Sequence, residues 1–357
     1  MENRIQQLAA GLPDGIDGVL ITSEPNRQYF TGMHSSAGTV LVFKNGAAYF
    51  FIDSRYVERA RQLASGYEVI LQKELYAQLA EKIREHQAGK IAIESEAVTV
   101  SEYMRMKNRL QGIHLVMEER VNAQIRRMRM LKSAEEIAAI KAAQQLTEEA
   151  FAHICGYIKA GMTDRQIAGE LLDYTYRHGS ERPAFDYIVV SGKHSSMPHG
   201  VPTDKIVEPG DFITMDYGCV VDGYCSDMTR TVAVGQVSRE QEEIYQIVLQ
   251  AQQAAIQAVH GGARCAQVDQ AARDIIAGRG YGDCFGHSTG HSLGLEIHEL
   301  PTFSPRDFSV CEPGMVITVE PGIYLEGKFG VRIEDMVLVT EAGCENLTAA
   351  PKNLLCL

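Results

Sequence analysis

The segments Glu208–Gly218, EPGDFITMDYG, and Glu312–Gly322, EPGMVITVEPG, share the pattern E-P-G-x-x-I-T-x-[D/E]-x-G at an offset of 104 residues. Seven of the eleven positions match when Asp and Glu are counted together. An H-x-x-P sequence precedes each copy, at His199–Pro202 and at His298–Pro301. This repetition predicts that the region from about 134 to 345 is a duplicated α–α–β–β unit, whose halves face each other across a pseudo-twofold axis.

Helix start signals precede both copies of the repeat. Ser133, Thr163 and Ser238 are each followed three residues later by Glu or Gln, which is the spacing of a capping box. Apolar residues at helical spacing follow each of these positions, and a fourth helix is expected from about 266 to 276. Each copy of the repeat is therefore expected to follow a pair of helices.

The first 120 or so residues predict a separate α/β domain, and we place the domains at 1–125 and 126–357. Asn45-Gly46 lies between two apolar runs and is a strong signal for a hairpin turn. The basic cluster of Arg126, Arg127, Arg129 and Lys132 is followed by acids, and we interpret it as a solvated linker. The expected strands are 19–21, 40–43, 49–52, 69–71 and 91–93, and the expected helices are 56–64 and 75–85.

Composition excludes several classes of function. The chain has 357 residues, enough for two domains, and a formal net charge of −12, which argues against a nucleic-acid surface because phosphate binding needs clustered Lys and Arg. No apolar run approaches the length of a signal peptide core or a membrane span. The eight cysteines include no C-x-x-C pair. We expect a cytoplasmic protein with reduced thiols that binds neither nucleic acid nor membrane.

Acidic residues recur at matched points of the two halves. Asp216 and Glu320 each end an apolar run, where a carboxylate is costly unless it is paired or bound to a metal. A second acid follows each across a predicted hairpin, Asp227 after 11 residues and Glu334 after 14. Four buried acids would repel one another, whereas two divalent metals would neutralise them, and His291 suits such a site. Asp227 alone would suggest a salt-bridged or hairpin-surface residue, but the five together favour a metal centre.

Longer motifs around these residues resemble those of the pita-bread metallopeptidases, in the Xaa-Pro branch of aminopeptidase P and prolidase. The first domain, with NRQYFTG at 26–32, resembles the small creatinase-like domain of that branch. The resemblance implies a mixed α/β (α+β) chain, with a small N-terminal creatinase-like α/β domain followed by a C-terminal pita-bread domain, and a homodimer. The segments that carry it are DGYCSDMTRT at 222–231, FGHSTGHSLGLEIHELP at 285–301, EPGIY at 320–324 and VRIED at 331–335.

The same resemblance implies roles for the five ligands. Asp227 and Glu334 would bridge two metals, Asp216 would complete one of them, and His291 with Glu320 would complete the other. Oxygen ligands with one imidazole favour Mn²⁺, although Co²⁺ or Zn²⁺ would also fit. Two such ions can activate a water and polarise the scissile carbonyl.

Further residues are assigned around the ligands. His199 and His298 are expected to hydrogen-bond the substrate carbonyl and the developing oxyanion, or to handle the proton of the leaving nitrogen. Alternatively, His199 and His298 have only a structural role in the turns before Pro202 and Pro301. Glu320 is expected to accept the proton of the attacking water. Arg332 would orient a carboxylate unless it is a surface residue, and Tyr324 would line the site or simply pack. His287 and His194 are interpreted as hydrogen-bonded structural residues rather than ligands.

The leading hypothesis is a hydrolase, an Xaa-Pro aminopeptidase that cuts between an N-terminal residue and proline in the second position of a small peptide. Prolidase, the Xaa-Pro dipeptidase, is the alternative. A methionine aminopeptidase is disfavoured by the N-terminal domain and by the sequence Asp216-Tyr217-Gly218. A non-catalytic pita-bread binding protein, or a metal-free creatinase-like hydrolase, is disfavoured because all five ligands are present. Leu300, where many relatives carry an acid, is expected to alter the rim of the pocket.

Overall fold

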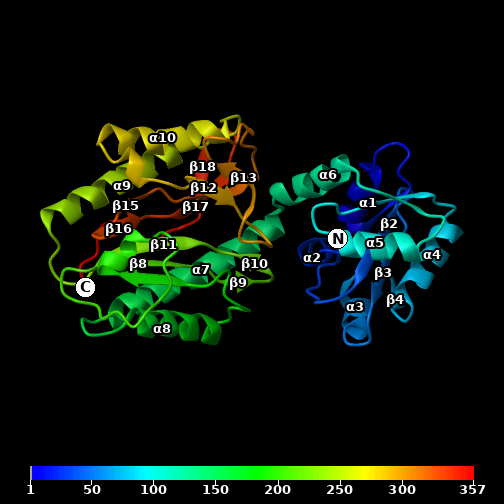
Figure 1. Cartoon of the computed structure of the whole chain (residues 1–357), viewed down its shortest axis with the longest axis horizontal. Coiled ribbons are helices and arrows are strands. Elements are labelled where there is room, and N and C mark those ends of the chain that lie inside the picture. The colour runs from blue at the N-terminus through cyan, green and yellow to red at the C-terminus, as the bar shows by residue number, and fades with distance from the viewer. Residues whose placement is uncertain (1) are drawn as a thin grey trace. The chain divides into compact units, whose positions relative to one another are not determined.

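The computed structural model describes residues 2–357, and the chain divides into two compact units at Arg129 and Met130. Both contain helices and strands, in agreement with the expected mixed α/β class (Figure 1). None of the helices within the described part of the chain combines the length and the apolar character that a bilayer crossing requires.

The first unit is built on one mixed sheet with the strand order β4-β3-β2-β1-β5-β6. The pairs β1–β2 and β2–β3 are antiparallel, whereas β3–β4, β1–β5 and β5–β6 are parallel. The central strands are buried along their whole length, which is typical of a sheet covered on both faces. The strands are β1 Gly18–Ile21, β2 Thr39–Phe43, β3 Ala48–Ile52, β4 Glu68–Leu71, β5 Lys90–Ile93 and β6 His114–Val116.

The predicted strands of this unit are confirmed, and β6 is an addition. The turn at Asn45-Gly46 joins β2 to β3 as predicted; Gly46 has a φ of 86°, and the Asn45 side chain accepts a hydrogen bond from the Ala47 N–H. The predicted helices correspond to α3 and α4. The helices of the unit are α1 Glu2–Ala10, α2 Glu24–Thr31, α3 Val57–Leu63, α4 Leu75–Glu85, α5 Val100–Arg109 and α6 Glu119–Met130.

The interpretation of the basic cluster as a solvated linker is wrong. Arg126, Arg127 and Arg129 belong to α6, and Arg126 pairs with Glu96 and Glu119. Lys132, just beyond the helix, is buried. The local pattern of basic residues followed by acids did not reveal these partners because most of them lie elsewhere in the chain.

The second unit carries the duplication. In one half α7 and α8 pack on the sheet β11-β8-β7, and in the other α9 and α10 pack on the sheet β13-β12-β14-β17-β18. Figure 1 shows the helices on the two outer sides of the unit with the strands between them. The helices are α7 Ala134–Tyr157, α8 Asp164–Arg177, α9 Arg239–Ala258 and α10 Cys265–Gly278, and the short 3₁₀ helices are η1 Gly192–Ser196 and η2 Gly282–Cys284.

Matched local signals begin the matched elements. Ser133, Thr163 and Ser238 form the predicted capping boxes of α7, α8 and α9. The two E-P-G sequences form equivalent turns, with φ of 93° at Gly210 and 97° at Gly314, which only glycine adopts readily. The strands of the unit are β7 Ile188–Ser191, β8 Phe212–Tyr217, β9 Val220–Val221, β10 Tyr224–Cys225, β11 Met228–Ala233, β12 Gly290–Ser292, β13 Glu299–Phe303, β14 Val316–Val319, β15 Gly322–Leu325, β16 Phe329–Arg332, β17 Asp335–Val339 and β18 Cys344–Asn346.

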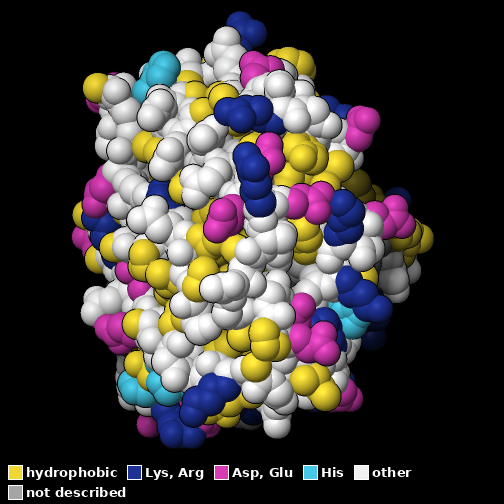
Figure 2. Space-filling model, turned by 90° about the vertical axis from the view of Figure 1, so that its left-hand side faces the viewer, with side chains coloured by type: hydrophobic (Ala, Val, Ile, Leu, Met, Phe, Trp, Pro, Cys, Tyr) yellow, Lys and Arg dark blue, Asp and Glu magenta, His cyan; other side chains and the backbone are white. Residues whose placement is uncertain are grey.

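Charged side chains of both signs are intermingled on the face drawn in Figure 2, where Lys and Arg stand beside Asp and Glu.

Candidate metal centre and active site

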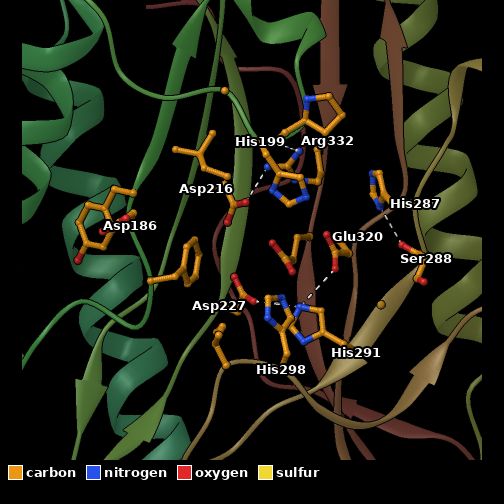
Figure 3. Close-up of a pocket in the computed structure, with 18 of the residues that line it drawn as sticks. Asp186, His199, Asp216, Asp227, His287, Ser288, His291, His298, Glu320 and Arg332 are labelled. Atoms are coloured by element: carbon orange, nitrogen blue, oxygen red, sulfur yellow. Dashed lines mark hydrogen bonds and ion pairs between the residues drawn. The ribbon is translucent and has the colours of Figure 1, made fainter.

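A pocket of about 690 Å³ lies in the second unit. The structure brings the five predicted metal ligands to this pocket, together with both H-x-x-P histidines and Arg332. Figure 3 shows the carboxylates of Asp216, Asp227 and Glu320 pointing into the same space as the ring of His291. Tyr324 does not line the pocket but is hydrogen-bonded to Arg332 behind its wall.

The four acids come from equivalent places in the two halves. Asp216 lies in β8, and Glu320 directly follows β14. Asp227 precedes β11, and Glu334 lies between β16 and β17. Thr229 of β11 joins the halves, since its carbonyl accepts the Glu334 N–H at 3.1 Å and its hydroxyl donates to Glu334 Oε2 at 2.6 Å.

His291 is the nitrogen donor at the centre of the acids. Its Nε2 lies 3.5 Å from Asp227 Oδ2 and 3.4 Å from Glu320 Oε1. Donor atoms of Asp227, His291 and Glu334 all lie within 4.8 Å of one another. Nδ1 is 3.1 Å from the Ser292 carbonyl and donates to it, which leaves the lone pair of Nε2 directed at the acids. Burial, followed by the neighbouring His298, lowers the pKa of His291 to about 4, so the ring is neutral and able to bind a metal.

The carboxyl groups are too deeply buried and too close together for all of them to be ionised without cations. Burial and then the neighbouring acids raise the pKa of Asp227 and of Glu334 well above the usual range. Burial raises the pKa of Glu320 to about 8. Asp216 Oδ1 is buried without a hydrogen-bond partner. A set of oxygen donors with one neutral imidazole, raised carboxyl pKa values and an unpaired buried oxygen fits divalent cations.

A buried hydrogen-bond chain supports Asp216. Arg332 donates from Nη2 to Asp216 Oδ2 at 2.6 Å, from Nη1 to the Tyr324 hydroxyl at 2.8 Å and from Nε to Thr229 Oγ1 at 3.0 Å. The Tyr324 hydroxyl lies 2.8 Å from His287 Nε2, and His287 Nδ1 donates to the Ser288 carbonyl. His287 is therefore a hydrogen-bonded residue in the structure, and burial lowers its pKa to about 4.

The two H-x-x-P histidines line the pocket near its exposed side. The ring of His298 lies 4.4 Å from that of His291, centre to centre, at an interplanar angle of 66°. Burial and the neighbouring His199 lower the pKa of His298. His199 lies next to Pro198, whose carbonyl accepts a hydrogen bond from Arg332 Nη1 at 3.3 Å. Leu300 also lines the pocket, where its side chain is partly exposed.

Sequence reasoning missed the threonines that hold the ligands. Thr318 Oγ1 accepts the His291 N–H at 3.0 Å, and Thr229 contacts both Glu334 and Arg332. The signal for Thr318 was present, because it is the threonine of the repeated E-P-G-x-x-I-T pattern. Its counterpart Thr214 is buried against Thr231 at 3.1 Å between the hydroxyl oxygens. A polar residue repeated inside a buried strand indicates a structural hydrogen bond.

Comparison with known proteins agrees with the whole architecture. A family model described as Metallopeptidase family M24 matches residues 138–341, and one described as Creatinase/Prolidase N-terminal domain matches residues 4–131. A Xaa-Pro dipeptidase of Pyrococcus furiosus is 36% identical over 99% of this chain and 100% of that protein.

Two solved structures are similar along nearly the whole chain. A Xaa-Pro dipeptidase from Bacillus anthracis has a TM-score of 0.95 at 40% identity, with 99% of each chain covered. An X-Pro aminopeptidase from Thermotoga maritima has a TM-score of 0.91 at 38% identity, with 96% of this chain and 98% of that chain covered. Relatives of similar identity thus carry both names.

Proposed function

Because the chain belongs to metallopeptidase family M24, in its Xaa-Pro peptidase branch, we propose that it is an Xaa-Pro aminopeptidase that acts with two bound divalent cations. It hydrolyses the bond between an N-terminal residue and a proline in the second position. Mn²⁺ is the cation that we propose, because four carboxylates and one imidazole form a set of hard ligands; Co²⁺ and Zn²⁺ are the alternatives.

The observation that carries the proposal is the convergence of four carboxylates and a neutral imidazole on one pocket. We assign Asp227 and Glu334 as bridging ligands, Asp216 as a ligand of one cation, and His291 with Glu320 as ligands of the other. The unpaired Asp216 Oδ1 and the raised carboxyl pKa values support this assignment. When bound, the cations supply Lewis-acid activation of water and of the scissile carbonyl.

The remaining polar groups act on the substrate. His298 and His199 hydrogen-bond the substrate carbonyl and the oxyanion that develops from it, or handle the proton of the leaving proline nitrogen. Glu320 accepts the proton of the attacking water. Arg332 and Tyr324 orient Asp216 through the buried chain of hydrogen bonds.

The apolar part of the pocket supports proline specificity. An imide nitrogen has no N–H, so a site for it needs no acceptor at that point and tolerates an apolar wall. Apolar side chains that line the pocket come from the β7 region, from the loop after η1, and from β13 with the loop before it. They are Phe185, Ile188, Val201, Ile297 and Leu300.

The charges that line the pocket favour peptides longer than two residues. A dipeptide presents a free carboxylate on its proline, and a buried carboxylate needs a cation. Among the described residues that line the pocket, Arg332 is the only Lys or Arg, and its guanidinium is engaged by Asp216, Tyr324, Thr229 and Pro198. Burial and the neighbouring His199 lower the pKa of His298, which disfavours its cationic form. A tripeptide, whose proline carbonyl is an amide, avoids this cost.

Prolidase is the second candidate, because relatives at 36% and 40% identity bear the name Xaa-Pro dipeptidase. Metal-stripped protein with and without added Mn²⁺ should be assayed on Ala-Pro and Ala-Pro-Ala, with Ala-Ala-Ala as the control. Metal-dependent cleavage of the proline tripeptide, alone or faster than the dipeptide, supports the aminopeptidase. Cleavage of Ala-Pro alone would identify a dipeptidase. Bound metal without cleavage of either proline peptide would contradict the proline assignment.

A further inference from the structure

A buried ion pair lies beside the catalytic pocket but outside the set of groups described so far. Lys132 follows α6, and its Nζ is 3.1 Å from Glu299 Oε2; the two side chains are 1% and 7% exposed. The same Nζ is 3.5 Å from Ser292 Oγ. The backbone N–H of Lys132 donates to the carbonyl of Gly314 in the second E-P-G turn. Lys132 therefore ties the start of the second unit to β12, β13 and the second E-P-G turn, which lie 160 or more residues further along the chain.

Both carboxylate oxygens of Glu299 accept hydrogen bonds from protein groups. Its Oε2 accepts a hydrogen bond from the Lys132 ammonium, and its Oε1 accepts one from the Glu296 N–H at 3.3 Å. Gly294 leaves room for the carboxylate, because a Cβ there would lie 2.9 Å from both carboxylate oxygens. Although Glu299 lines the pocket, its carboxylate is directed at protein groups and not at a substrate.

The pair lies directly behind two histidines of the proposed active site. Ser292 of β12 is paired with Glu299 of β13, and both contact Lys132. The residues that precede them are His291 and His298, whose rings lie 4.4 Å apart. Successive side chains of a strand point to opposite faces. The lysine therefore holds Ser292 and Glu299, the residues that directly follow the two histidines, while both imidazoles line the pocket.

The ladder between these strands is irregular at this point. His291 pairs with Thr302, but the next residue, Ser292, pairs with Glu299, so Leu300 and Pro301 have no partner on β12. Such a bulge locally disrupts the backbone hydrogen bonds that would otherwise hold His298 in register. A side-chain contact on the other face can supply the missing restraint.

We propose that Lys132 and Glu299 are positioning residues that hold the His298 imidazole against His291 at the substrate oxygen. This inference rests on the proposed function, in which His298 contacts the substrate. The pair acts through β13 and does not touch the substrate itself. Its loss should lower kcat more than it changes KM or the affinity for metal.

The first test is Glu299→Gln, assayed on Ala-Pro-Ala at saturating Mn²⁺. We expect kcat to fall about 10- to 100-fold, the range typical of groups that orient a catalytic residue, with KM within about threefold. Lys132→Arg, which keeps the charge, should lose far less kcat than Lys132→Met. A loss confined to Mn²⁺ affinity, with kcat unchanged in the loaded enzyme, would overturn the proposal.

A double variant separates positioning from stability. Lys132→Met with Glu299→Leu removes both buried charges, and such replacements are often neutral or stabilising. We expect this variant to unfold near the wild-type temperature while its kcat stays as low as that of Glu299→Gln. Wild-type kcat in the double variant would show that the pair is purely structural and would overturn the proposal.

The matched control is Lys141→Met on α7, the helix that begins two residues after Lys132. Lys141 pairs with Glu345 at 2.7 Å, but both side chains are about half exposed, at 44% and 51%. This variant should keep wild-type kcat and KM. Absence of Ala-Pro-Ala cleavage by the wild-type protein would instead overturn the proposed function, and the positioning role with it.

Discussion

Arg332 Nη2 donates a 2.6 Å hydrogen bond to Asp216 Oδ2, and the two side chains are only 4% and 12% exposed. The guanidinium also reaches Tyr324 and Thr229, so one side chain orients a carboxylate, a phenol and a hydroxyl. A planar group with a fixed fork of donors can do this, whereas a lysine ammonium cannot reach all three partners.

Arg332→Lys is therefore expected to impair the enzyme even though the charge is retained. We expect kcat/KM on Ala-Pro-Ala to fall about 10- to 100-fold, because Asp216 loses its fixed orientation. Tyr324→Phe removes the hydroxyl that contacts Arg332 and His287 but leaves the Arg332–Asp216 hydrogen bond, and should have a smaller effect. Steady-state kinetics at saturating Mn²⁺ provide the measurement, and a fully active Arg332→Lys variant would contradict the orienting role.

Removal of a bridging carboxylate should separate activity from folding. Asp227→Asn and Glu334→Gln are each expected to abolish metal-dependent hydrolysis and to lower the metal content of the purified protein. The metal-free variants should be at least as stable as metal-free wild type, because Asn and Gln are neutral isosteres of carboxyl groups whose ionised forms are disfavoured by burial and by the neighbouring acids. Elemental analysis and thermal unfolding in chelator provide the measurements. Wild-type turnover in either variant would refute the bridging assignment.

The stability of the metal-free protein should depend on pH with a predictable sign. The pKa of Glu320 is raised to about 8, so the folded state holds a proton that the unfolded chain releases near pH 4.5. The free energy of unfolding therefore falls as pH rises toward 8. His291 and His287, with pKa values of about 4, act in the opposite direction, but only below pH 6.5.

Between pH 6.5 and 8, therefore, His291 and His287 do not contribute to the pH dependence of the free energy of unfolding. There we expect Glu320 to contribute a decrease of about 1 kcal/mol per pH unit, and Asp227 and Glu334 to add to it. Urea titrations in chelator would measure the slope, and Glu320→Gln should reduce it. Added Mn²⁺ should remove the dependence. A stability that increases with pH across this window would contradict the protonated state of these acids.

The two pocket histidines should affect the chemical step without affecting the metals. His298→Gln is expected to lower kcat about 100-fold or more, as the loss of one oxyanion donor does in other hydrolases, with unchanged metal content. His194→Gln is the matched control, because His194 lies in η1 and does not line the pocket. A His298→Gln variant with kcat within about threefold of wild type would exclude the role in oxyanion stabilisation.

Much of the fold was predictable because its signals are local. Capping boxes at Ser133, Thr163 and Ser238 mark helix starts within four residues, and the Asn45-Gly46 turn depends on backbone conformations that few residues adopt. Apolar runs identified the strands of the first unit. The duplicated E-P-G pattern also carried long-range information, since equivalent sequences adopt equivalent places on either side of an axis.

The sequence by itself determined much of the secondary structure, the duplication and the identity of the acids that converge. Only the tertiary structure decided which partner each buried charge has. Arg332 meets Asp216 across 116 residues, and Lys132, grouped by sequence with a solvated basic cluster, meets Glu299 across 167. The sequence around a basic residue is the same whether its side chain is exposed to water or buried against a carboxylate. The choice depends on which distant segment packs against it, and therefore on the fold as a whole.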